Sequence, residues 1–438
     1  MKSFSAVSLL FALLVARGPA FAQAGGPATA GAAATADTAA PPEVLAGAVL
    51  RQCRGLFGTR ARCVERALDG VLERSGVARA MAVLDAAVAR DPGLTPEAHG
   101  IAHGLGIAAY RSPETVAATF ASCPNTQIAG CMHGVIQGYF LDVARRTGEI
   151  SAADLDALCQ PHRATPPLYF ECTHGMGHGL MAAYAHRLPD VLARCDQLAD
   201  PTARDSCWGG AFMENIVGAL HPGHTAEAHS AVSHHGAASP DHSTMDHSAH
   251  GGSAADHAAM GHDAAPAARW RPLDRRDLLY PCTAVDAKYH QACYTIQTAA
   301  ILAMNGGRVG HTARACSRAP REMVPVCHAS LGRDLTAYAR RDPRRTARLC
   351  ARAGVAATDC LRGAAYALYD VAARPADALA LCRAVSREAQ KTACYEAVAR
   401  RVKIGTPEPR TLAEVCALAE PGYVAACRAA AGLDAQTQ

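Results

Sequence analysis

The chain has 438 residues, of which half are hydrophobic but only 5% are aromatic, and its formal net charge at pH 7 is +4. Ala and Leu dominate the apolar residues, a composition that favours close-packed helices and argues against a sheet-rich fold. The length exceeds that of one ordinary domain, so several packed units are expected.

The first residues have the organisation of a secretory signal. Lys2 precedes an apolar run from Val7 to Val15, and Ala20-Phe21-Ala22 is a small-x-small cleavage signal. The run is too short for a permanent membrane span, and no later stretch is long and apolar enough for one. We therefore predict a cleavable signal peptide at 1–22, a disordered Ala/Gly/Thr/Pro leader at 23–42, and export to an oxidising compartment, a bacterial periplasm.

The 18 cysteines form nine neighbouring pairs in chain order. An even set of cysteines in an oxidising compartment predicts disulfides rather than free thiols or metal ligands. The predicted pairs are Cys53 with Cys63, Cys123 with Cys131, Cys159 with Cys172, Cys195 with Cys207, Cys282 with Cys293, Cys316 with Cys327, Cys350 with Cys360, Cys382 with Cys394, and Cys416 with Cys427.

The first cysteine of each pair recurs at a nearly fixed step. Cys123, Cys159 and Cys195 are 36 residues apart, and from Cys282 to Cys416 the steps are 34, 34, 32 and 34. The step of 70 between Cys53 and Cys123 leaves room for one unit without cysteines. A period of this length is typical of a solenoid of helical hairpins.

Turn signals place two helices in each unit. Asp342-Pro343 begins a short helix that Gly354 ends, and Cys360 opens a longer one, so each disulfide bridges a helical turn. We predict an all-α solenoid of about ten hairpins, with repeats at 43–220 and 269–432 and nine intra-repeat disulfides. Each bridge stabilises its hairpin by about 2–3 kcal/mol.

The spacing Cys123-Pro-Asn-Thr-Gln-Ile-Ala-Gly-Cys131 resembles that of the cysteine-rich secreted relatives of tetratricopeptide repeats. The resemblance extends over residues 43–432 in period and cysteine placement, although the other pairs enclose nine to twelve residues. It implies an architecture, and since such solenoids usually bind partners, a partner-binding role is its functional expectation.

Aligning the N-terminal units on their second cysteine, or on Glu97 in the unit without cysteines, gives a ladder of histidines: His99, His103, His133, His174 and His178. The spacing of four in two units puts both imidazoles on one helical face, and Gln137 holds the second position in the middle unit. Glycines beside the ladder would let the helix backbones approach closely. Neutral imidazoles suit copper, zinc, nickel or iron, and we predict a metal site that Glu214 or Asn215 would border. The alternative is that the histidines hydrogen-bond carbonyl groups of neighbouring helices.

Residues 221–268 interrupt the period and are rich in His, Met, Asp, Ala, Gly and Ser. No apolar period is present, so we predict a disordered segment. Imidazole and thioether groups are suitable copper ligands, and the sequence Met245-Asp246-His247-Ser248 resembles the Met/His-rich segments of periplasmic copper-resistance proteins. The predicted ligands here are His242, Met245, His247, His250, His257, Met260 and His262. The alternative is a solvated linker.

The part of the chain from residue 270 onward is basic, with 25 Lys and Arg against 15 Asp and Glu. Six arginines cluster around one repeat start: Arg340, Arg341, Arg344, Arg345, Arg348 and Arg352. In an exported protein this charge predicts an envelope protein or another acidic ligand as partner rather than nucleic acid. A solvated helix face is the alternative.

The sequence contains no catalytic triad, phosphate-binding loop or nucleotide fingerprint. His99-Gly-Ile-Ala-His103 and His174-Gly-Met-Gly-His178 share the spacing of a zinc-protease helix but lack its glutamate between the histidines. We favour a periplasmic metal-binding protein, copper first, that captures, buffers or delivers its metal. An interaction scaffold and a metal-dependent enzyme using the ladder are the alternatives, with binding favoured over catalysis.

Overall fold

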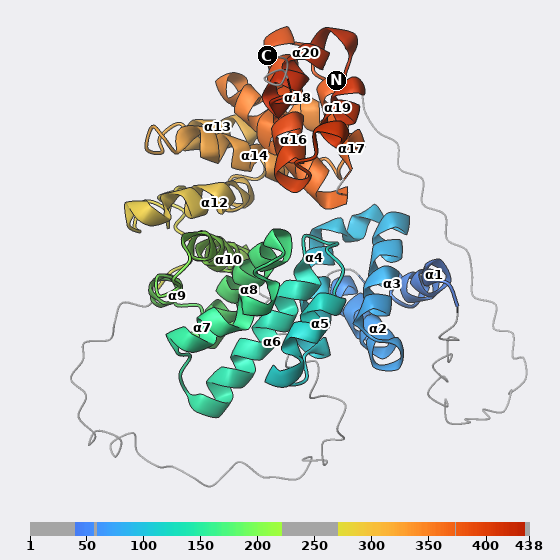
Figure 1. The fold of residues 1–438 in the computed structure, drawn as a ribbon, viewed down its shortest axis with the longest axis vertical. Helices are drawn as coiled ribbons and strands as arrows, with labels where there is room; N and C mark the ends of the chain where they lie inside the picture. Colours follow the sequence, from blue (N-terminus) through green and yellow to red (C-terminus); the bar gives the residue numbers. More distant parts are fainter. Residues whose placement is uncertain (1–39, 57–58, 221–269, 373, 434–438) are drawn as a thin grey trace, which may run out of the picture. The chain divides into compact units, whose positions relative to one another are not determined.

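The computed structural model describes residues 40–56, 59–220, 270–372 and 374–433, and in these ranges the chain forms nineteen α-helices and no strand (Figure 1). The predicted all-α class is therefore confirmed. The predicted signal peptide, nearly all of the leader and the His/Met-rich segment lie outside the described residues. Within these ranges each helix is too short or too polar to cross a bilayer.

The helices are arranged as hairpins, each with a first and a second helix. In the N-terminal part these are α1 (Pro42–Gln52) with α2 (Arg60–Ser75), α3 (Val77–Arg90) with α4 (Thr95–Ala109), α5 (Val116–Ser122) with α6 (Gly130–Thr147), α7 (Ala152–Cys159) with α8 (Pro166–Ala183), and α9 (Leu188–Cys195) with α10 (Pro201–Leu220).

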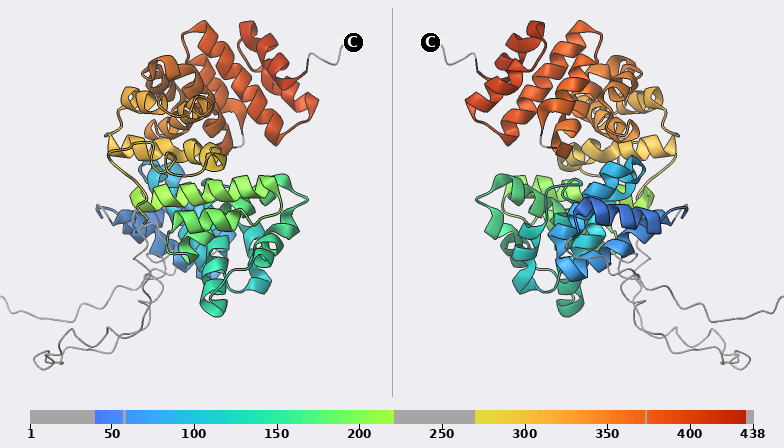
Figure 2. Two further views of the ribbon diagram at one scale, coloured as in Figure 1. Left: turned by 90° about the vertical axis from the view of Figure 1, so that its left-hand side faces the viewer. Right: turned by 90° about the vertical axis from the view of Figure 1, so that its right-hand side faces the viewer.

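The C-terminal part continues the same pattern. In the unit of Cys282 the described residues form turns at 278–284 where a first helix was predicted, so only its second helix, α12 (His290–Met304), is present there. The hairpins that follow are α13 (Val309–Cys316) with α14 (Val324–Tyr338), α15 (Pro343–Ala351) with α16 (Ala357–Ala372), α17 (Pro375–Arg383) with α18 (Glu388–Gly405), and α19 (Pro409–Ala417) with α20 (Val424–Ala431). Each second helix packs on the second helix of the next hairpin, from α2 and α4 through to α18 and α20. Figure 2 shows this parallel run of second helices in the part coloured orange to red.

All nine predicted disulfides are present, each joining the end of one helix or turn to the first turns of the next helix. The hairpin of α3 and α4 has none and is held differently. Asp91 accepts a hydrogen bond from the Gly93 amide at 2.9 Å and forms an ion pair with Arg60 of α2. Polar contacts at this turn thus tie the second hairpin to the first.

The stack continues directly from α10 to α12. Asp196 accepts hydrogen bonds from Lys288 and Tyr289, each at 2.7 Å, and so joins the α9 end to the turn before α12. Asn215 of α10 donates to the Pro272 carbonyl at 3.0 Å and accepts from the Trp270 indole at 3.0 Å. The residues on both sides of the His/Met-rich segment therefore pack against one another.

Second helices approach so closely that their backbones touch at glycines. A Cβ atom on Gly106 of α4 would lie 2.1 Å from the Cys131 carbonyl oxygen, and one on Gly134 of α6 would lie 2.1 Å from the His103 carbonyl oxygen. Gly177 on α8 and Gly210 on α10 repeat this contact. Since no real Cβ fits at such distances, only glycine permits this helix spacing.

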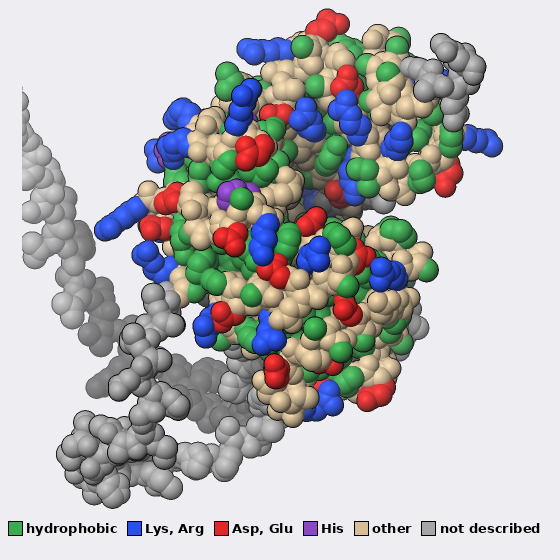
Figure 3. Space-filling model, turned by 60° about the vertical axis from the view of Figure 1, so that its left-hand side comes forward, with side chains coloured by type: hydrophobic (Ala, Val, Ile, Leu, Met, Phe, Trp, Pro, Cys, Tyr) green, Lys and Arg blue, Asp and Glu red, His purple; other side chains and the backbone are tan. Residues whose placement is uncertain are grey.

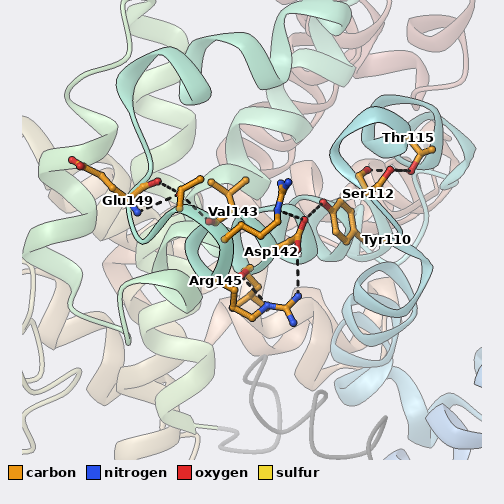
Figure 4. Close-up of polar contacts among 10 residues, drawn as sticks. Tyr110, Ser112, Thr115, Asp142, Val143, Arg145 and Glu149 are labelled. Atoms are coloured by element: carbon orange, nitrogen blue, oxygen red, sulfur yellow. Dashed lines mark hydrogen bonds and ion pairs between the residues drawn. The ribbon is translucent and has the colours of Figure 1, made fainter.

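A polar contact fixes the other end of the α4–α6 pair (Figure 4). The Tyr110 hydroxyl at the end of α4 donates to Asp142 at 2.9 Å, and Asp142 also pairs with Arg146 at 3.1 Å. Burial, with the hydrogen bond to Asp142, raises the pKa of Tyr110, so this hydroxyl remains a donor at neutral pH. The glycine contact and this hydrogen bond together set the register of α4 on α6.

The arginine cluster lies around the turn from α14 into α15. Arg341 is half-buried, and burial lowers its pKa, whereas the other five arginines are exposed. On the face drawn in Figure 3, basic side chains are interspersed with acidic ones. A partner for these arginines stays a prediction.

We expect Gly134→Ala to lower the free energy of unfolding by about 1–3 kcal/mol, because the added methyl overpacks a backbone contact. Gly70→Ala in α2 is the matched control, since its methyl would meet only the guanidinium end of Arg74 at 3.2 Å. That change should be neutral or stabilising, because alanine favours helix by about 1 kcal/mol over glycine. Urea unfolding of the disulfide-bonded protein measures both, and equal effects would contradict the contact.

Candidate metal centre

The structure brings all five ladder histidines into one cluster on three consecutive second helices. His99 and His103 lie on α4, His133 on α6, and His174 and His178 on α8. Neighbouring ring centroids are 4.6 Å apart for His99 and His103, 5.5 Å for His103 and His133, and 5.0 Å for His133 and His174. His178 closes the group at 4.9 Å from His103 and 5.1 Å from His133.

The glycine contacts explain this closeness. Gly130 and Gly134 of α6 face the backbone of α4 beside His99 and His103. A Cβ atom on Gly175 of α8 would lie 3.2 Å from the Cα atom of His133. Imidazoles at equivalent positions of adjacent helices therefore reach one another directly. The prediction that glycines beside the ladder let the backbones approach is confirmed at Gly134 and Gly175.

The centre of the cluster is removed from solvent. His103 and His178 have no exposed surface and His133 is 1% exposed, while His99 and His174 are half-buried. Burial lowers the pKa of His99, and lowers the pKa values of His133, His174 and His178 well below the usual range. These four imidazoles are therefore neutral at neutral pH, the state in which imidazole binds a metal.

Two groups of three histidines have the geometry of a ligand set. Ligand nitrogens of His99, His103 and His133 all lie within 4.8 Å of one another, and the same holds for His133, His174 and His178. His133 belongs to both groups and stands at the centre of the cluster. Three imidazoles around one position suit a borderline first-row transition metal.

Carboxylates from neighbouring helices orient two of the histidines. Glu214 Oε2 of α10 lies 2.8 Å from His178 Nδ1, and Glu171 Oε2 of α8 lies 3.0 Å from His133 Nε2. A neutral imidazole donates its N–H to such a carboxylate, so its other nitrogen carries the lone pair. The remaining nitrogens, His178 Nε2 and His133 Nδ1, are buried and have no hydrogen-bond partner among the described residues.

That pairing is the arrangement found in metal sites, where the ligand histidine gives its second nitrogen to a carboxylate. Buried polar atoms are otherwise almost always hydrogen-bonded, so two inward-facing nitrogens without partners need an explanation. A metal ion bound to these lone pairs supplies one. Burial raises the pKa of Glu171.

The α4 histidines have polar partners of their own. His99 Nδ1 lies 2.8 Å from the Gln127 carbonyl oxygen, and His103 Nδ1 lies 3.3 Å from Gln137 Oε1. Gln127 starts a turn with three consecutive left-handed residues before α6, at φ of 49°, 56° and 54°. Such a turn costs about 1–2 kcal/mol per residue, and the Cys123–Cys131 disulfide that encloses it helps to retain it.

The site differs from the sequence-based prediction in several residues. Of the two residues predicted as alternative neighbours of the cluster, Glu214 contacts His178, while Asn215 forms hydrogen bonds with Trp270 and the Pro272 carbonyl group. Within the cluster, His99 contacts a backbone carbonyl group, as the purely structural alternative required, whereas His133 and His178 contact carboxylates. The predicted ligands in 221–268 lie outside the described residues.

Sequence reasoning missed Glu171 and Gln127. Glu171 precedes His174 by three residues, so it lies on the same face of α8, and that spacing was the available signal. No local pattern identifies Gln127, because its carbonyl oxygen contacts His99 only through the left-handed turn before α6.

Compared with family models, curated proteins and solved structures, the chain shows no match. The chemistry of the site is therefore inferred from its own geometry. Two groups of three histidines, which share His133, could hold a metal ion.

We expect the metal-free protein to lose stability as the pH falls below about 6.5, the usual pKa of histidine in an unfolded chain. The lowered pKa values of His133, His174 and His178 mean that the unfolded state binds protons there while the folded state does not. The free energy of unfolding is then greatest above this pH, and falls by about 1.4 kcal/mol per pH unit for each such proton.

Urea midpoints of the metal-free protein at pH 7.5, 6.5 and 5.5 measure this loss. His133→Gln with His178→Gln should flatten the dependence, while His290→Gln, on α12 and outside the cluster, should leave it unchanged. An unaltered slope in the double variant would show that these imidazoles are not buried and neutral.

Proposed function

We propose that this protein binds a transition-metal ion, copper first, in the five-histidine centre, and captures, buffers or delivers that metal in an oxidising compartment such as the periplasm. One observation carries the proposal. His133 Nδ1 and His178 Nε2 are buried and have no hydrogen-bond partner among the described residues, while Glu171 and Glu214 contact the other ring nitrogens.

Copper is favoured by ligand chemistry. Sites built from nitrogen ligands bind divalent copper more tightly than zinc, nickel or iron at equal availability. The predicted Met and His ligands of residues 221–268 would add weaker sites that also suit reduced copper. The nine disulfides and the predicted signal peptide support an oxidising compartment outside the cytoplasm.

The geometry also suits tight retention rather than rapid exchange. The three central histidines are nearly inaccessible, and their positions are fixed by backbone contacts between α4, α6 and α8. A preformed, rigid ligand set avoids the ordering cost that a flexible segment must meet on binding metal. We therefore assign storage to the centre and capture to the His/Met-rich segment.

We expect the full chain, exported to a bacterial periplasm, to retain a stoichiometric metal ion, and His133→Ala with His178→Ala to lose it. The matched control is His328→Ala, a buried histidine in the first turn of α14 that bonds the Ala313 carbonyl at 3.2 Å instead of facing the cluster. Deleting 221–266 should remove only the weaker metal. Elemental analysis measures all four proteins, and no metal above the double variant would exclude the proposal.

We expect Glu214→Gln to weaken metal binding by about 10- to 100-fold without abolishing it, because the carboxylate orients His178 and raises its basicity. The matched control is Asp142→Asn on α6. Asp142 lies nine residues beyond His133, and its carboxylate interacts with Tyr110 and Arg146. Competition against a chromophoric chelator gives both affinities. Equal losses in the two variants would show that Glu214 acts through stability alone.

A further inference from the structure

A pocket of about 270 Å³ adjoins the histidine cluster at its α8 end. Its walls include Phe170 and His174 of α8, Trp208, Gly209 and Met213 of α10, and Ile296 of α12. The surface that lines the pocket is mainly apolar, although polar side chains, among them Thr202, Asp205, Ser206 and Gln291, also contribute. The volume is just below the usual range for small-molecule sites, about 300–1,000 Å³, so one or two rings would fill it.

The pocket lies where the ladder would continue. His133 and His174 each stand two residues after the second cysteine of their hairpin, and Gly209 holds this position after Cys207. A Cβ atom on Gly209 would lie 3.4 Å from His174 Nδ1, so a side chain here would grow directly against that imidazole. The missing side chain of Gly209 leaves the space that the pocket occupies.

The pocket and the cluster share one face of the helix stack. Thr295 of α12 has the same place after Cys293 as the first ladder histidines have after their cysteines. Met213 and Arg333 have the place of His178, six residues after Cys207 and Cys327. All three line the pocket, so the face that carries imidazoles on α4, α6 and α8 becomes a ligand-sized hollow over α10, α12 and α14.

His174 is common to both features. It forms a ligand group with His133 and His178, and one side of its ring is a wall of the pocket. Phe170 stacks on it with ring centroids 5.7 Å apart and is itself 46% exposed. A large exposed aromatic ring beside a candidate metal ligand provides a surface on which an apolar molecule can pack.

Two of the three charged side chains that line the pocket are already paired: Lys288 forms an ion pair with Asp196 at 2.7 Å, and Arg333 forms one with Asp334 at 2.6 Å. The third, Asp205, is exposed to solvent. An anion would have to compete with the paired carboxylates, and a ligand charge of either sign would be desolvated against Trp208 and Ile296. An uncharged ligand meets neither cost.

We infer that this pocket binds a small, uncharged, mainly apolar organic molecule of one or two rings, which packs against His174. The inference rests on the proposed function in one respect: binding here perturbs the metal held by His133, His174 and His178. Metal binding at these histidines would then respond to the organic ligand, which a site used only for storage would not need.

The test uses 2-naphthalenemethanol as the neutral probe, with 2-naphthoate and 2-naphthylmethylamine as charged counterparts of similar size. Calorimetry on the full chain, with and without metal, should show binding of the neutral probe and at least about ten-fold weaker binding of each charged one, a difference of about 1.4 kcal/mol. Comparable affinity for all three would overturn the inference.

Two substitutions fill the pocket from opposite walls. Gly209→Leu and Ala292→Phe should each weaken binding of the neutral probe by about ten-fold or more, since each side chain occupies the space of a ring. Gly209→Ala is the matched control, because its methyl makes only ordinary contact with His174 at 3.4 Å and should preserve binding. Unchanged affinity in both filled variants would place the probe elsewhere and overturn the inference.

The link to the metal centre has its own readout. In protein loaded with Co(II), saturation with 2-naphthalenemethanol should shift the visible spectrum, and Gly209→Leu should abolish the shift. An unshifted spectrum at saturation would overturn the link through His174. Failure to load cobalt or copper would instead contradict the proposed function. Binding of the probe to the metal-free protein would still test whether the pocket holds a ligand.

Discussion

The backbones of α4, α6, α8 and α10 touch one another at glycines, and the geometry of the candidate site depends on this contact. Between α4 and α6, at Gly106 and Gly134, and between α8 and α10, at Gly177 and Gly210, a methyl group would lie about 2 Å from a carbonyl oxygen of the facing helix. Between α6 and α8, a methyl group on Gly175 would lie 3.2 Å from the Cα atom of His133. With glycine at the contact, imidazoles that repeat once per hairpin become direct neighbours.

That proximity would be unfavourable for charged groups, and burial resolves the conflict. Desolvation holds most of the clustered imidazoles neutral, and the two carboxylates each contact one ring nitrogen of His133 or His178. The other nitrogen of each ring is buried and has no hydrogen-bond partner among the described residues. The disulfides matter here because hairpins rich in Ala and Gly bury little apolar area, so each cross-link offsets part of the cost of this polar centre.

The C-terminal hairpins show what the same architecture does without such a site. On α12 and α14, Thr298 donates to Asp334 at 2.7 Å and shares a hydrogen bond with Ser330 at 2.6 Å, and Arg333 pairs with the same carboxylate. These buried groups find their partners within the protein. In the N-terminal cluster, by contrast, His133 Nδ1 and His178 Nε2 are buried without a hydrogen-bond partner among the described residues, and so could bind another ligand.

The sequence by itself determined the hairpin period, the nine disulfides and the identity of the five clustered histidines. These follow from local rules, because two cysteines about ten residues apart lie on either side of the turn between two helices, and two imidazoles four residues apart share one helical face. Only the tertiary structure decided that the cluster is buried, that Glu171, Glu214 and Gln127 orient it, and that Gly209 leaves a pocket beside His174. Those features depend on how far apart adjacent helices lie and on the path of a left-handed turn. Neither quantity is encoded in the spacing of residues along one helix.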